Sequence, residues 1–148
     1  MVNSKVMSAA AGFVFEPRKL AEQQLQFGNT ALALRPAAKV DIADPRWGAA
    51  QLQHLVANTV REALAAKGTS LSAWVRDHHA DRSGLGYDRL IRIQRGETMM
   101  QLADLFHWAT TFDTVADLLA THQFALSSAP VAPAFAGETG PRGPHTSR

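Results

Sequence analysis

The sequence predicts an all-α fold, a small five-helix bundle at residues 44–124. Three observations support this fold class. Apolar residues recur at helical spacing in five short segments of this region. Residues that begin and end helices separate those segments, and none of the segments shows the alternating pattern of a strand. The chain has 148 residues, of which 46% are hydrophobic, which is enough for one modest globular core.

The first predicted helix begins at Asp44-Pro45, because aspartate is a favoured N-cap and proline is favoured at the first helical position. Gly68 ends this helix. Trp47 lies just inside its start, and we expect its ring to seal the helix onto the bundle. The apolar residues at helical spacing along the helix are Leu52, Leu55, Val56, Val60, Ala63 and Leu64.

Four shorter helices follow. Ser70 is a suitable cap for the second helix, and Gly96 ends the third helix, which runs over residues 86–95. Thr98 is expected to cap the fourth helix, and Asp113 or Thr114 begins the fifth. In the second helix, helical spacing relates Leu71, Trp74, Val75 and His78. The residues of the other three helices expected to face inward are Leu90, Ile93, Leu102, Leu105, Phe106, Ala109, Val115, Leu118 and Leu119.

Both ends of the chain are interpreted as additions to this domain. Residues 1–43 lack a sustained apolar pattern and form an N-terminal extension. Residues 125–148 contain four of the seven prolines and are expected to be a disordered tail. Four basic residues of the extension suit either a phosphate or minor-groove arm or a solvated linker. They are Arg18, Lys19, Arg35 and Lys39.

Several functional classes find no support in the sequence. The chain has no cysteine, which excludes disulfides and thiolate chemistry, and no apolar run long enough to span a bilayer. No nucleophile elbow, phosphate-binding loop or zinc-protease motif is present. The adjacent pair His78-His79 would point about 100° apart on a helix, which disfavours a shared metal ion. We therefore expect a cytoplasmic, non-enzymatic protein without a cofactor or metal.

The net charge is only +2, but the basic residues are unevenly distributed. Arg82, Arg89, Arg92 and Arg95 lie close together in the sequence, and Asp88 is the one acidic residue between the first and the last of them. Such a local basic stripe suits a surface that docks phosphates. An ordinary solvated helix face is the alternative interpretation.

Residues 84–97, GLGYDRLIRIQRGE, resemble the recognition-helix segment of the Cro/lambda-repressor-like helix-turn-helix family. The resemblance extends over residues 52–120, and one departure is a longer connection before Leu85. It implies a sequence-specific DNA-binding regulator, a repressor of bacterial or phage type, with residues 86–95 in the major groove. The residues at matching places are Gly84, Leu85, Leu90, Ile93 and Gly96.

The resemblance also assigns contacts to individual residues. Tyr87, Asp88 and Arg92 match the places that read bases, and arginine suits bidentate contact with guanine. The remaining residues are expected to contact phosphates, which sets the register without reading sequence. These expected phosphate contacts are Ser70, Arg82, Arg89 and Arg95.

Double-stranded DNA and a second copy of the chain are the expected partners, because such domains commonly bind as dimers. The dimer surface is expected either on the N-terminal extension or on the fourth and fifth helices, with Phe106, Trp108 and Phe112. Two alternatives stay open. The domain serves as a protein-binding adaptor, or the chain is an antitoxin-like protein that binds both a partner protein and its own operator.

Overall fold

A computed structural model of the chain describes residues 15–78 and 86–122. It confirms the all-α fold and the five helices. In these two ranges the backbone forms no β-strand, and an isolated bridge pairs Ala21 with Pro36. The α-helices are α2 (Pro45–Ala66), α3 (Leu71–His78), α4 (Tyr87–Gln94), α5 (Leu102–Thr111) and α6 (Asp113–Thr121). Two 3-10 turns precede them, η1 (Pro17–Leu20) and η2 (Gln24–Gln26). The predicted disordered tail lies outside the described residues.

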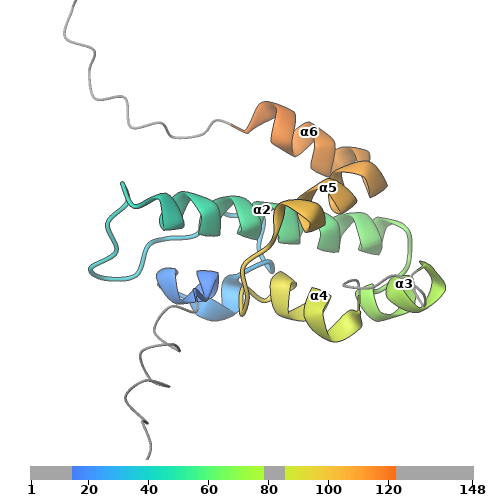
Figure 1. The fold of residues 1–148 in the computed structure, drawn as a ribbon, viewed down its shortest axis with the longest axis horizontal. Coiled ribbons are helices and arrows are strands. Elements are labelled where there is room, and N and C mark those ends of the chain that lie inside the picture. The colour runs from blue at the N-terminus through green and yellow to red at the C-terminus, as the bar shows by residue number, and fades with distance from the viewer. Residues whose placement is uncertain (1–14, 79–85, 123–148) are drawn as a thin grey trace, which may run out of the picture.

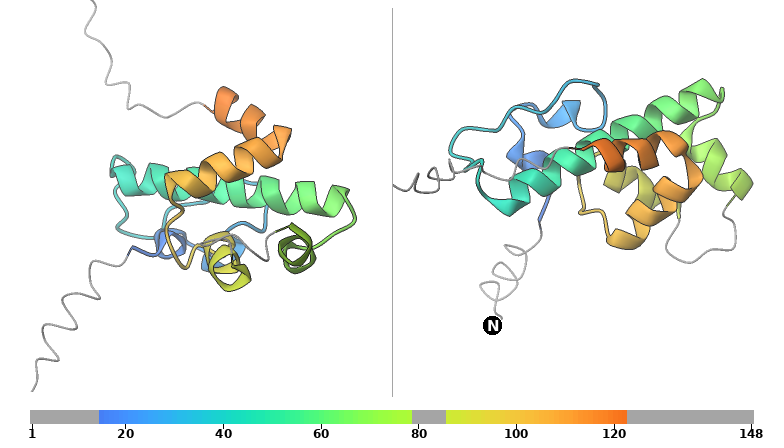
Figure 2. Two further views of the ribbon diagram at one scale, coloured as in Figure 1. Left: turned by 45° about the vertical axis from the view of Figure 1, so that its right-hand side comes forward. Right: turned by 90° about the horizontal axis from the view of Figure 1, so that it is seen from above.

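The long helix α2 runs through the middle of the molecule (Figure 1). Helices α5 and α6 lie on one side of it, and α4 lies on the other side together with η1 and η2. The turned views show the same arrangement, with α3 beside the C-terminal end of α2, on the same side as α4 (Figure 2). None of the described helices is both long and apolar enough to cross a membrane.

The predicted boundaries of α2 and α4 are confirmed. The Asp44 carboxylate accepts a hydrogen bond from the Arg46 backbone N–H at 2.9 Å, and Pro45 occupies the first helical position. Gly68 and Gly96 follow α2 and α4 with φ of 69° and 70°, a left-handed conformation that glycine adopts without steric cost. Ser70 also caps α3, since its hydroxyl accepts from the Ala73 N–H at 3.3 Å.

Three aromatic side chains form the centre of the main core, and we call them the aromatic core: Trp74, Trp108 and Phe112. The ring centroids of Trp74 and Trp108 are 5.1 Å apart, and those of Trp108 and Phe112 are 5.8 Å apart. Trp108 is completely buried and Trp74 is 5% exposed. The aromatic core therefore joins α3 to α5, and the prediction that Trp74 is a core residue is confirmed.

The predicted start of the fourth helix is wrong, and so are two of the four residues expected to face inward; the other two, Leu105 and Ala109, do pack against the main core. α5 begins at Leu102, and its cap is Gln101, which pairs reciprocally with Asp104, instead of Thr98. Leu102 and Phe106, expected to face inward, are 75% and 69% exposed. Because the α5 segment carries apolar residues on several sides, its pattern alone does not identify the buried face. Packing of Trp108 against Trp74 decides it.

Residues 15–44, which we call the N-terminal segment, fold against α2. Their apolar side chains pack with two residues of that helix, Trp47 and Ala57, in a second core cluster. Trp47 therefore seals α2 onto the N-terminal segment, instead of onto the bundle as predicted. The members of the cluster from the segment are Ala21, Phe27 and Leu34.

His54 of α2 connects this segment to the helix. Its ring is fully buried, Nδ1 accepts from the Gly28 backbone N–H at 2.8 Å, and Nε2 lies 2.8 Å from the Leu32 carbonyl oxygen. A carbonyl only accepts, so Nε2 carries the proton and the imidazole is neutral. Burial lowers the pKa of His54 below its usual value, against an opposing contribution from the Leu32 carbonyl.

The His54 geometry predicts acid-sensitive stability. In the unfolded chain the imidazole binds a proton near pH 6.5, whereas the folded protein resists protonation, so the unfolded state binds more protons. The free energy of unfolding should therefore decrease as the pH falls through about 6.5, until it reaches the lowered folded-state pKa. Urea unfolding midpoints at about pH 8 and about pH 5.5 measure this loss.

His54→Asn provides the control, because its side chain is neutral at both pH values. The variant should unfold more easily at either pH, but the decrease of its midpoint on acidification should be smaller than in the wild-type chain. An equal decrease in both proteins would show that other groups carry the pH dependence.

Candidate nucleic-acid interface

Helix α4 is attached to the rest of the protein by one face. Its Leu90 and Ile93 side chains are 1% and 0% exposed and belong to the main core. Backbone carbonyls at the end of the helix are also bound, since the buried Gln53 side chain donates to the Ile93 carbonyl at 3.0 Å. The helix is therefore held firmly while its opposite face points outward.

That outward face contains the three predicted base-contact residues. Tyr87 is 41% exposed, and Asp88 and Arg92 are also exposed. At about 100° per residue these positions lie within one arc of the helix, roughly opposite Leu90 and Ile93. Asp88 lies in the first turn, where a carboxylate is favoured by the helix dipole. The structure thus brings Tyr87, Asp88 and Arg92 together on one solvent-facing surface.

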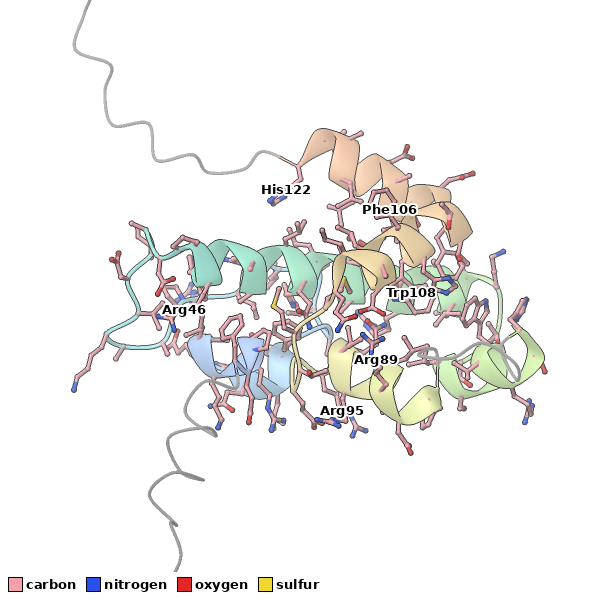
Figure 3. The ribbon with its side chains drawn as sticks, in the orientation of Figure 1. Arg46, Arg89, Arg95, Phe106, Trp108 and His122 are labelled. Carbon is pink, nitrogen blue, oxygen red and sulfur yellow. The ribbon has the colours of Figure 1, made fainter. Side chains whose placement is uncertain are left out.

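Arg89 points in another direction, between α4 and α5 (Figure 3). Its Nη1 and Nη2 donate to the two carboxylate oxygens of Asp104 at 2.5 and 2.7 Å. The hydrogen bond to Asp104 raises the pKa of Arg89, and partial burial opposes this. Asp104 is 3% exposed and also accepts from the Gln101 backbone N–H. A bidentate pair of this kind joins α4 to α5, so this guanidinium is already engaged within the protein.

Arg95 comes directly after α4 and lies at its outer edge (Figure 3). Arg92 and Arg95 are both exposed, and neither forms an ion pair with another described residue. The basic stripe predicted from the sequence is therefore reduced, among the residues described, to these two guanidinium groups. The remaining member, Arg82, lies outside the described residues.

Ser70 lies at the start of α3 and is exposed. Its hydroxyl caps the helix and also lies 3.2 Å from the Ser72 hydroxyl. A capping hydroxyl keeps further hydrogen-bonding capacity, so the phosphate contact expected for Ser70 stays a prediction.

Two of the four basic residues of the N-terminal segment form ion pairs within the protein. Arg18 lies 3.4 Å from Glu97 and 3.8 Å from Glu16, and Lys19 lies 3.4 Å from Glu16. Arg35 and Lys39 are exposed. The Arg18 backbone N–H donates to the Gly96 carbonyl at 3.0 Å, so this part of the segment is attached to the end of α4.

The predicted dimer surface on the fourth and fifth helices requires a correction. Trp108 and Phe112 are 0% and 4% exposed and belong to the aromatic core, so they are not available to a second chain. Phe106 is exposed, one helical turn from the exposed Leu102. These two residues form the apolar surface of α5.

Sequence reasoning missed the support that the N-terminal segment gives to α4. Gly28 has φ of 66°, and a Cβ atom there would overlap the Gln94 carbonyl oxygen. Gln94 in turn donates from Nε2 to the Ala57 carbonyl at 3.2 Å. This close approach has no periodic sequence signal, and Gly28 itself was the sole indication of it.

Within the described part of the chain, no group of three or more histidine, aspartate or glutamate side chains is placed to hold a metal ion. No family model, curated protein or solved structure matches this chain.

Proposed function

We propose that this chain is a sequence-specific DNA-binding transcriptional regulator that reads the major groove with α4. The observation that carries the proposal is the division of α4 into two faces. Leu90 and Ile93 hold the helix, and the opposite face presents Tyr87, Asp88 and Arg92 to solvent. A firmly held helix with an arginine and hydrogen-bonding groups on its free face suits direct readout of base edges.

The remaining contacts follow from this placement. Arg92 is assigned to a guanine and Arg95 to a backbone phosphate, with the start of α3 at Ser70 on a second phosphate. Arg89 is left out, because Asp104 already binds its guanidinium. With few free cations we expect the affinity for DNA to depend only weakly on salt concentration. For each phosphate contact, a tenfold rise in salt should lower the affinity about tenfold.

A dimer is part of the proposal, because one such domain makes few contacts and a second copy raises the affinity. The exposed Leu102 and Phe106 of α5 suit a self-complementary contact. The same apolar surface favours the second candidate function, a protein-binding adaptor or antitoxin-like partner. We place the protein in the cytoplasm and assign it no enzymatic activity.

Selection from a random pool of DNA duplexes tests the proposal. The wild-type chain should enrich a palindromic motif. Arg92→Ala should lose the base preference at one position of each half-site and weaken binding by about 1–3 kcal/mol, because a bidentate contact to guanine is removed. The measurement is the enriched base frequency at each position, at one fixed salt concentration.

Arg95→Ala is the matched control, since it removes the same charge one helical turn away. It should weaken binding to all sequences about equally and leave the motif unchanged. If the folded wild-type chain enriches no motif, the proposal that α4 recognises a DNA sequence is wrong. Copurification with a stoichiometric partner protein would then support the adaptor function.

A further inference from the structure

A cavity of about 510 Å³ lies between the N-terminal segment and the three helices α2, α3 and α4. Most of its wall is apolar, with contributions from every one of these elements. The apolar wall includes Phe27, Leu64, Leu71 and Ile91, and the highly exposed Leu25 lies at the cavity's edge. This size and lining are typical of sites for small organic ligands. Because Arg18, Arg61 and Arg95 belong to its lining, we call it the arginine-lined cavity.

Three arginines also line this cavity, and none of its lining residues is acidic among those described. Arg61 is held in place, since it donates to the Gly28 carbonyl at 3.2 Å and to the Asn58 side chain at 2.6 Å. A guanidinium has five N–H donors, so Arg61 keeps donors for a ligand. Arg18 is partly neutralised by Glu97, whereas Arg95 has no ion-pair partner among the described residues.

We propose that the arginine-lined cavity binds a small amphipathic anion, such as a carboxylate with an aliphatic or aromatic body. Arg95 and Arg61 bind the charged group, and the leucine, isoleucine and phenylalanine side chains cover the apolar body. A backbone phosphate of DNA needs exposed cations but no apolar wall, so the lining favours the amphipathic ligand. The inference holds whether or not α4 reads DNA, and where it does, the ligand and a DNA phosphate compete for Arg95.

Calorimetric titration of the full chain with decanoate tests the proposal, with decanol as the neutral probe of equal chain length. We expect decanoate to bind about tenfold more tightly than decanol, and inorganic phosphate to bind more weakly than decanoate. Arg95→Ala should weaken decanoate binding about tenfold and leave decanol binding unchanged. Arg95 is exposed, so this variant should keep its fold.

Two tryptophan substitutions on α2 locate the bound probe. Ala65 lines the cavity and Ala66 does not, although both are exposed near the end of the helix. Ala65→Trp should fill the cavity and weaken decanoate binding at least about tenfold, while Ala66→Trp binds like the wild-type chain. Equal decanoate binding by both variants overturns the proposal. So does equal affinity for decanoate and decanol, or no decanoate binding at all.

Discussion

Trp108→Ala is expected to lower the free energy of unfolding by about 3–5 kcal/mol, the largest loss of any substitution considered. The Trp108 side chain is completely buried between Trp74 and Phe112. Its removal therefore leaves a cavity that movement of α3 and α5 fills only partly. Since domains of this size are stable by about 5–15 kcal/mol, much of the stability is lost. Urea unfolding followed by circular dichroism measures the change.

Trp108→Phe distinguishes lost packing from lost hydrogen bonding. The Trp108 Nε1–H is buried and has no hydrogen-bond partner among the described residues. An unsatisfied buried donor costs about 1–3 kcal/mol, so phenylalanine loses volume but also removes this penalty. We expect Trp108→Phe to cost clearly less than half of the alanine effect. A loss as large as that of alanine would indicate that Nε1 donates a hydrogen bond that stabilises the fold.

Asp104→Asn is expected to lower the free energy of unfolding by about 3 kcal/mol. The substitution removes the charge that faces Arg89 and leaves a partly buried guanidinium without its carboxylate. The loss should lie near the lower end of the range of about 3–5 kcal/mol for breaking a buried ion pair. The reason is that the Arg89 side chain is 33% exposed and water partly solvates it. Thermal and urea unfolding of the variant measure this effect.

Asp113→Asn is the matched control, because it makes the same chemical change at an exposed acid in the first turn of α6. It should cost no more than about 0.3–1 kcal/mol, the size of a helix-dipole interaction. Adding Arg89→Met to Asp104→Asn should recover part of the loss, since the partly buried charge that Asp104 compensates is then also removed. If the double variant is as unstable as the sum of the two single variants, the pair does not act as a unit.

Local signals predicted the boundaries of α2 and α4. Asp44-Pro45, Gly68 and Gly96 act within a few residues of the chain, so their effect is readable without knowing the tertiary contacts. The outward face of α4 was also predictable, because Leu90 and Ile93 are the residues of that helix that suit a core. The sequence therefore predicted which face of this short amphipathic helix is exposed, while the DNA contacts assigned to that face stay predictions.

Long-range contacts account for the differences between expectation and structure. Burial of Asp104 has no hydrophobic signal, although Gln101 three residues earlier gives the spacing of a capping box. Its pairing with Arg89 links helices that are separated in sequence, and it engages a guanidinium that the sequence assigned to a phosphate. In the N-terminal segment, short 3-10 turns have no apolar period, and the segment is held by side chains of α2 such as His54 and Gln51.

The close approach of Gly28 to the Gln94 carbonyl has a consequence for altering what this protein binds. Replacing the whole of α4 with a helix from another protein would place foreign residues against a glycine turn that has no room for a side chain beside the Gln94 carbonyl. The positions open to exchange are instead the exposed ones, such as Tyr87, Asp88 and Arg92. New specificities are therefore best sought by point substitution on this helix, with Gln94 and Gly96 retained.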